Sequence, residues 1–271
     1  MKSSMRKLFI ILLGLTSSNS YASESFTWIS QLGKMSGLEE QFHAVGIHHY
    51  EHVLSFPLIG ILLVIAGLVY RAKTVNPESS IVPDRGISFR NIVEMYGSFI
   101  QSQAKGVLGE KEAPKHFNFI ATVFILIFLS NLIGLIPGFL PPTETINTTL
   151  PFGILTFLYF NLKGMKEQGV INYLKHFMGP LWYLGVLIFP IEIISICIRP
   201  ISLSLRLYGN MFGDHMVLSI FSGLAPAIIP IIFMVLGLLV CFIQAYVFTV
   251  LSMVYISLAT AHQDHGEHAH H

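Results

Sequence analysis

The fold of this chain is decided by the stretch FPIEIISICIRPISLSLRLYGNMFGDH, which runs from Phe189 to His215. It is apolar enough to lie in a membrane, yet it contains charged and other polar side chains. These are Glu192, Ser195, Arg199, Ser202, Arg206, Asn210, Asp214 and His215. An ionisable group inside a bilayer costs about 3 kcal/mol on insertion scales and more than about 10 in simulations, so such groups usually mark ion paths. The stretch therefore predicts a membrane segment that serves ion movement.

The polar residues of this stretch follow the period of a helix. From Glu192 to Asp214 they recur every three or four residues, so a helix aligns them on one face. At a rise of about 1.5 Å per residue the stripe is roughly 33 Å long, comparable to a hydrocarbon core of about 30 Å. We therefore expect a polar stripe that runs through the depth of a membrane.

The composition of the whole chain excludes an ordinary soluble protein. Of its 271 residues, 53% are hydrophobic and 11% are charged, which is more apolar side chain than a soluble core covers. The net charge of +1 gives no support to a nucleic-acid partner. The cysteines, Cys197 and Cys241, both lie in apolar segments, and one pair supplies neither zinc-ligand spacing nor a disulfide framework. We expect membrane lipid as a partner, and neither a metal nor a cofactor.

The two ends of the chain have compositions of their own. Residues 1–22 combine a basic start, a short apolar run and the small-x-small motif Ser20-Tyr21-Ala22, which predicts a signal peptide. The competing interpretation is an uncleaved anchoring segment. Residues 23–52 would then form an N-terminal segment on the outer side of the membrane. Residues 259–271 form a His-rich tail, to which we assign no function.

Residues 53–258 predict a single transmembrane domain with about five membrane-crossing helices. The first three spans are expected at about 53–70, 117–136 and 150–162. Apolar sequence then continues from 177 to 258, which two long, strongly tilted helices with a turn near Gly223–Pro226 would accommodate. The predicted fold class is an all-α polytopic membrane protein with a long tilted C-terminal helical hairpin.

The loop after the first span fixes the predicted orientation. It is rich in lysine and arginine, which places it in the cytoplasm under the positive-inside rule. Residues 87–107 within it repeat apolar side chains with a period of 3.6, which predicts an amphipathic helix on the inner membrane surface. Counting the spans from an outer N-terminus places the C-terminus in the cytoplasm.

Arg206 is the residue of the stripe with the clearest chemistry. A guanidinium has a pKa above about 12, so it stays charged and cannot pass a proton on. It repels a passing cation and lowers the pKa of a nearby carboxylate. Because Glu192 lies about 21 Å away along the helix, we expect another subunit to supply the carboxylate partner of Arg206.

The other polar residues fall on two sides of Arg206, which predicts two half-channels separated by a positive charge. The residues on one side are Glu192, Ser195 and Ser202, and those on the other are Asn210, Asp214 and His215. Histidine and aspartate relay protons near neutral pH. Two interpretations stay open for Arg199, which would pair with Glu192 or extend to a membrane surface.

Several motifs resemble subunit a of the F-type ATP synthase membrane sector. The most specific are SLSLRLYGNMFGDH (202–215) and IQAYVFTVLSMVYI (243–256). The segments NLIGLIP (131–137) and PIEIISICIRPISL (190–203) are also similar to that family. The resemblance covers about residues 50–258. It implies a stator subunit of the bacterial inner membrane, without catalytic activity of its own, beside a ring of c-subunits and b-type peripheral-stalk subunits.

The resemblance also implies roles for individual residues. Arg206 would match the essential arginine that faces the ring carboxylates and keeps them ionised. The residues that would match the outer half-channel are Asn210, His215 and Gln244, and those near the cytoplasmic half-channel are Glu192 and Ser195. Protons would enter from outside, neutralise a ring carboxylate and leave inward after nearly a full turn.

Two positions depart from the family pattern. Many members carry a glutamate where His215 stands, and a histidine or glutamate where Gly237 stands. Because the second partner is missing here, we hypothesise that Asp214 supplies the lost carboxylate. Two other functions are considered: a secondary transporter in which Arg206 binds an anionic substrate, and a purely structural membrane scaffold.

Overall fold

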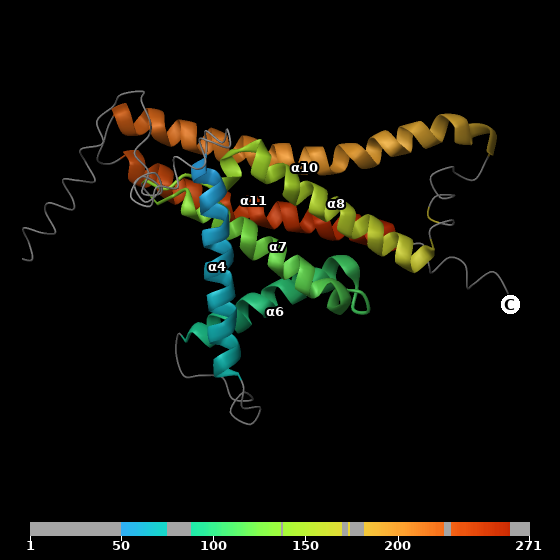
Figure 1. Cartoon of the computed structure of the whole chain (residues 1–271), viewed down its shortest axis with the longest axis horizontal. Helices are drawn as coiled ribbons and strands as arrows, with labels where there is room; N and C mark the ends of the chain where they lie inside the picture. Colours follow the sequence, from blue (N-terminus) through green and yellow to red (C-terminus); the bar gives the residue numbers. More distant parts are fainter. Residues whose placement is uncertain are drawn as a thin grey trace, which may run out of the picture.

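The structure is a computed structural model that describes residues 50–74, 88–136, 138–169, 173, 182–224 and 229–260. The predicted signal peptide, most of the N-terminal segment and nearly all of the His-rich tail lie outside these ranges. Six helices and one short 3-10 turn make up the described part, which contains no strand (Figure 1). They are α4 (Tyr50–Lys73), α6 (Phe89–Leu108), α7 (Ala113–Ile133), η1 (Pro142–Glu144), α8 (Ile146–Gln168), α10 (Trp182–Leu224) and α11 (Ile229–Thr260).

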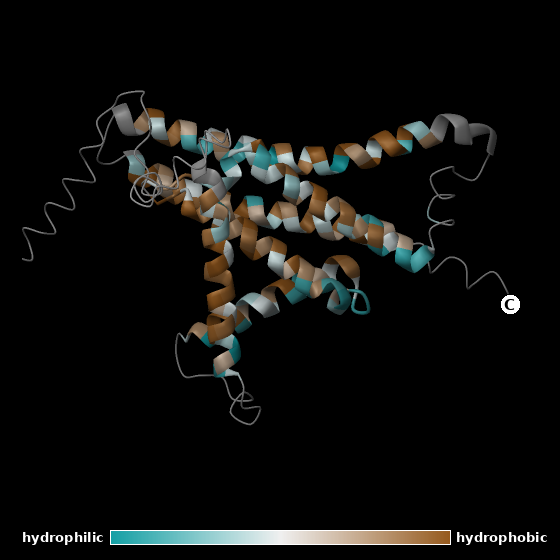
Figure 2. Cartoon of the chain, in the orientation of Figure 1, coloured by the Kyte–Doolittle hydropathy of each residue, from teal (hydrophilic) through white to brown (hydrophobic). Residues whose placement is uncertain are grey.

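Three helices of the described chain are long and apolar enough to cross a membrane. They are Leu54–Lys73, Ala113–Ile133 and Pro230–Thr260. α8 and α10 have 23 and 43 residues, long enough to cross, but they carry more charged and polar side chains. Figure 2 shows hydrophobic residues over most of α4 and hydrophilic residues at the far ends of α4 and α8. The prediction of an all-α polytopic membrane protein is confirmed.

The boundaries of the first spans differ modestly from the predicted ones. α4 and α7 lie within a few residues of their predicted positions, whereas α8 extends beyond the predicted 150–162 at both ends. It ends at Gln168, and the next residue, Gly169, has a positive φ of 80°, which glycine adopts without strain. The prediction was too short because it ended the span at the last apolar residue, while the hydrogen-bonded helix continues through a polar turn.

The C-terminal helical hairpin has the predicted form. α10 continues through Pro190 and Pro200, and the chain turns between Leu224 and Ile229. In Figure 1, α10 and α11 follow the long axis of the molecule, and α4 runs across them. Because α4 has the length and hydropathy of a simple span, this arrangement supports a strong tilt of α10 and α11 in the membrane.

The predicted surface helix is α6, and one side of it joins the core. Ile100 and Ala104 are buried, while Gln101 and Ser102 on the other side are exposed. The ring of Phe99 lies 6.2 Å from that of Phe124 on α7 and 6.3 Å from that of Phe242 on α11, centroid to centroid. α6 therefore supports the helix pair that carries the polar site.

α8 and α10 approach each other closely at Gly153. A β-carbon there would overlap the Ser204 hydroxyl and lie 2.5 Å from the Pro200 carbonyl oxygen, which is backbone and cannot swing away. Gly153→Ala is therefore expected to lower the free energy of unfolding by about 1–3 kcal/mol. Thermal or denaturant unfolding of the purified protein in detergent measures the change.

Gly67→Ala on α4 is the matched control for this substitution. A β-carbon at Gly67 would meet nothing within 4 Å, and alanine is the better helix former. We expect unchanged or slightly raised stability for Gly67→Ala. Equal stability of the two variants would contradict the tight α8–α10 contact.

Candidate functional site

Arg206 lies on the outward face of α10. The neighbouring Leu203 and Leu207 are buried in the main core, which fixes the rotation of the helix and turns Arg206 away from it. The residues exposed around Arg206 include apolar Ile201, Leu205 and Phe212. In the described part of the chain no carboxylate lies within ion-pair distance of the guanidinium. Arg206 is thus a charged group on an apolar surface, and none of the carboxylates that the structure describes is its ion-pair partner.

The helix face next to Arg206 is open. Ser202 and Gly209 are exposed, one turn to either side, and β-carbons built at Gly209 and Gly213 would meet nothing within 4 Å. Small residues at such spacing let a second helix approach the backbone closely. The surface around Arg206 therefore has room for a helix of another subunit.

Asn210 joins α10 to α11 one turn from Arg206. Its side-chain nitrogen Nδ2 donates a hydrogen bond of 2.6 Å to Oε1 of Gln244, which is buried. The sequence predicted both residues for one half-channel, and the structure brings them together although 34 positions separate them. The amide pair places a polar connection between the exposed face of Arg206 and the interior of the helix pair.

His215 lies one further turn along α10, and its partner is Glu144. The ring nitrogen Nδ1 is 2.8 Å from Oε1 of Glu144, with 33% of the histidine and 14% of the glutamate side chain exposed. The hypothesis that Asp214 supplies the carboxylate for His215 finds no support in this contact. Successive residues of a helix point about 100° apart, so Asp214 and His215 face different ways.

The turn η1 holds Glu144 in place. The adjacent Thr143, which is buried, donates a hydrogen bond of 2.7 Å to Oδ1 of buried Asn131 on α7. Behind it, a β-carbon at Gly134 would lie 2.7 Å from the ring of Pro141, so the loop packs directly against glycine. Asn131 and Gly134 belong to the NLIGLIP motif, which therefore positions a carboxylate opposite α10.

A cavity of about 210 Å³ lies beside the His215–Glu144 pair. Its polar lining includes Asn131, Asp214 and His215, and Gly237 and Cys241 of α11 close another side. The oxygen Oδ2 of Asp214 is buried and has no hydrogen-bond partner within the described chain. A cavity of this size has room for several water molecules, and those beside its polar groups would hydrate Asp214 and connect it with His215.

The sequence reasoning missed Glu144. A signal for it exists, because Glu144 is the sole charged residue between residues 117 and 162, in a short loop joining two predicted spans. The residue that contacts it lies 71 positions away, so the pairing itself is a product of tertiary structure.

The predicted residues of the other half-channel lie further along the same helix. Glu192 and Ser195 are half-buried on α10, about three to four turns from Arg206. Of the two interpretations left open for Arg199, the described structure contains no ion pair with Glu192. The guanidinium carbon of Arg199 lies 5.3 Å from the centre of the Tyr255 ring on α11, a cation–π contact that replaces a charged partner.

Residues 53–257 match the family described as ATP synthase A chain. The chain is 47% identical over 219 residues to ATP synthase subunit a of Bdellovibrio bacteriovorus, which covers 80% of this chain and 94% of that protein. It is 49% identical over 175 residues to ATP synthase subunit a of Geobacter sulfurreducens, covering 64% and 76%. For ATP synthase subunit a of Sorangium cellulosum the identity is 37% over 244 residues, covering 86% and 95%. These matches favour the predicted stator subunit over a secondary transporter. The long tilted helix pair, the arginine on its open face and these matches together show that the chain belongs to the ATP synthase A chain family.

Proposed function

We propose that this chain is the stator subunit that forms two proton half-channels and couples proton flow to rotation of a c-subunit ring. The observation that carries the proposal is Arg206. It is a permanent charge on the open, apolar face of a helix in a membrane protein, and no carboxylate of the described chain neutralises it. A charge in such a place is costly unless a partner supplies the opposite charge. A carboxylate on each subunit of a rotating ring supplies the opposite charge as it passes Arg206.

The outer half-channel runs through the cavity beside α11. Protons reach the water-accessible cavity, pass the His215–Glu144 pair and Asp214, and continue to the Asn210–Gln244 amides next to the ring. Histidine and carboxylates exchange protons near neutral pH, whereas the amides orient water. The route ends one helical turn from Arg206, where a ring carboxylate accepts the proton.

The inner half-channel lies on the other side of Arg206. Glu192 and Ser195 line the α10 face there and receive the proton that a ring carboxylate releases when it approaches the guanidinium. Because Arg206 stays charged and repels cations, protons cannot pass directly from one half-channel to the other. Each charge that crosses gains about 2.3 kcal/mol per 100 mV, so several crossings are summed for one ATP.

The remaining assignments follow from the proposed family role. Residues 53–258 act as one transmembrane domain in the bacterial inner membrane, preceded by the signal peptide of residues 1–22. The N-terminal segment faces outward and the C-terminus faces the cytoplasm. The partners are the c-ring at the face of Arg206, b-type peripheral-stalk subunits and membrane lipid, without a nucleic acid.

Photo-cross-linking from Leu205 tests where the ring lies. Leu205 is exposed beside Arg206 on α10, and a photoreactive residue there is expected to cross-link to a small two-helix proteolipid in native membranes. Leu68 on α4 is the matched control, since it is similarly exposed on a different helix. Mass spectrometry of the adducts identifies the partner. Failure at position 205, or equal yields at both positions, would argue against a ring on this face.

A further inference from the structure

We propose that Glu112, His116 and Glu167 bind one divalent transition-metal cation, with Zn²⁺ as the ion whose ligand preferences they match. Glu112 and His116 lie at the start of α7, and Glu167 lies in the last turn of α8. One ligand atom from each residue lies within 4.8 Å of the other two. Imidazole nitrogen together with carboxylate oxygen is a common ligand set for Zn²⁺. The three residues belong neither to the Arg206 face nor to the cavity lining.

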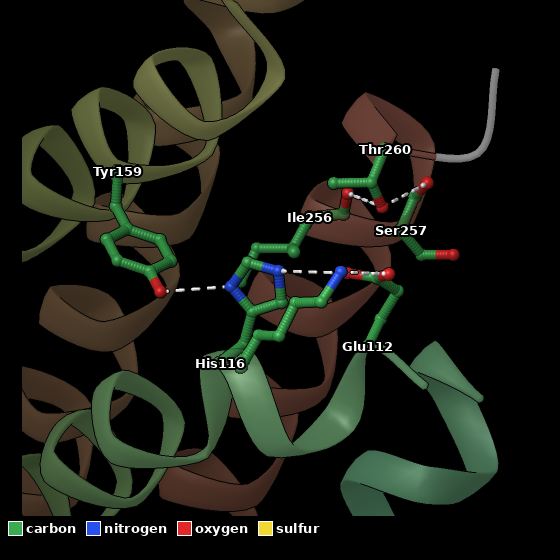
Figure 3. A network of polar contacts seen from close by, with 7 residues as sticks. Glu112, His116, Tyr159, Ile256, Ser257 and Thr260 are labelled. Atoms are coloured by element: carbon green, nitrogen blue, oxygen red, sulfur yellow. Dashed lines mark hydrogen bonds and ion pairs between the residues drawn. The ribbon is translucent and has the colours of Figure 1, made fainter. Parts of the chain in front are cut away.

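His116 has the features of a metal-binding histidine. Its side chain is 1% exposed, and its Nε2 has no hydrogen-bond partner in the part of the chain that the structure describes. On the other side of the ring, Nδ1 lies 3.0 Å from the hydroxyl oxygen of Tyr159 (Figure 3). When Nδ1–H donates to that oxygen, Nε2 keeps its lone pair for a metal. A second partner of this kind usually orients metal-bound histidines.

Tyr159 is itself held rigidly. Its ring stacks on Phe119 with centroids 3.7 Å apart and an interplanar angle of 3°. The hydroxyl group therefore occupies a defined position, which orients the plane of the His116 ring before any ion binds. Such preorganisation is what a histidine ligand requires from its surroundings.

Glu112 faces His116 across a gap of metal-binding size. Its Oε1 accepts a hydrogen bond of 2.6 Å from Lys115, but its Oε2 is buried and has no hydrogen-bond partner among the described residues. Oε2 lies 3.9 Å from Nε2 of His116, and a dashed line joins the two residues in Figure 3. This distance is too long for a hydrogen bond. Two ligands that each lie about 2.0–2.2 Å from a Zn²⁺ ion are separated by roughly 3–4 Å, so one ion between them would satisfy both buried atoms.

Glu167 completes the ligand set from a second helix. The end of α8 is anchored, because Nε2 of the next residue, Gln168, donates a hydrogen bond of 2.8 Å to the carbonyl oxygen of Ala259 on α11. Two carboxylates balance the charge of a divalent cation, whereas the nearby ammonium groups of Lys115 and Lys163 repel the cation. We therefore expect reversible binding with a water molecule in the fourth position. The ion would clamp α7 to α8 at the end predicted to face the cytoplasm.

Zinc binding is tested on the full-length protein purified from its membranes with its associated subunits. The tail histidines are also potential ligands, so every variant carries alanine at His262, His265, His268, His270 and His271. Equilibrium dialysis against Zn²⁺ counts bound ions, and the visible absorption of added Co²⁺ reports tetrahedral ligation. We expect the parent protein to bind one more ion per chain than His116→Gln or Glu167→Gln. Zn²⁺ should raise the unfolding temperature of the parent but not that of His116→Gln or Glu167→Gln.

Glu110→Gln provides the control for charge. Glu110 is exposed, lies two residues before Glu112 and is not one of the three proposed ligands. Glu110→Gln should therefore bind as many zinc ions as the parent does. ATP synthesis without added Zn²⁺ verifies that each variant is folded. Equal ion counts in the parent and in both ligand variants would overturn the proposal, as would an equal loss in Glu110→Gln. If His116→Gln fails to fold, the ion count of a folded Glu167→Gln variant still tests the proposal.

Discussion

Arg206→Ala is expected to abolish proton-driven ATP synthesis while leaving the subunit in the membrane. The side chain is exposed on α10 and makes no ion pair in the described chain, so its removal disturbs little of the core. Without the fixed charge, ring carboxylates would pass the interface still protonated, and protons could cross between the half-channels. ATP synthesis by inverted membrane vesicles should fall to the level of uncoupled vesicles, and passive proton leakage should rise.

Arg206→Lys tests whether a positive charge in water is enough at this position or whether the side chain has to stay charged in an apolar site. Lysine is positive in water but releases its proton in an apolar site, whereas the guanidinium does not. We therefore expect Arg206→Lys to be nearly as defective as the alanine variant. Ile201→Ala, an exposed apolar position near Arg206 on α10, controls for assembly and should keep most of the activity. Coupled synthesis by Arg206→Ala at the level of Ile201→Ala would fit a structural scaffold and would exclude the proposed mechanism.

The position of α10 could be predicted from the sequence because its helical form and the residues that share a face follow from the local pattern of the chain. A period of three to four residues fixes the helical face, and a permanently charged side chain on an apolar helix has few places to lie. Both facts are local, and the structure confirms a continuous helix with Arg206 exposed. The turn between α10 and α11 was predicted for the same reason, since glycine and proline interrupt the apolar sequence there.

The contacts that failed to be predicted are those between helices. For Arg199 the sequence left a pair with Glu192 and a position at the membrane surface open, and its contact with the Tyr255 ring on α11 was not foreseen. Likewise His215 was given its sequence neighbour as partner, although neighbouring side chains on a helix diverge. Its actual partner comes from a loop 71 positions away. Spacing along one helix determines which residues share a face, but the residues opposite that face depend on packing.

The His215–Glu144 pair leads to the second large effect. Glu144→Gln keeps the size of the side chain and the packing of η1, but removes the charge that faces His215 at 2.8 Å. A positioned proton acceptor contributes about 10²–10⁴ in rate, and water in the cavity would carry part of the flow instead. We expect proton-driven ATP synthesis to fall by about tenfold or more, measured in vesicles with an imposed pH gradient. Glu144→Asp should recover part of the activity.

Asp214→Asn is the comparison that separates the two carboxylates. Asp214 lines the same cavity but does not contact His215 in the described structure, so its loss should cost less than that of Glu144. A larger loss in Asp214→Asn than in Glu144→Gln would restore Asp214 as the principal carboxylate. Unchanged activity in Asp214→Asn would remove it from the proton path.

A second substitution at Gly237 should rescue the Glu144 variant. Gly237 lines the cavity on α11, and it is one of the two positions at which the sequence departs from the pattern expected from the resemblance. A β-carbon there would lie 2.7 Å from Cδ2 of Leu135, which is the flexible end of a side chain and can move aside. The double variant Glu144→Gln/Gly237→Glu returns a carboxylate to the cavity from the opposite wall. Recovery of synthesis above the level of Glu144→Gln would show that the cavity needs a carboxylate near His215 whichever element supplies it. Absence of recovery, in a double variant that assembles normally, would show that the carboxylate has to be supplied from η1.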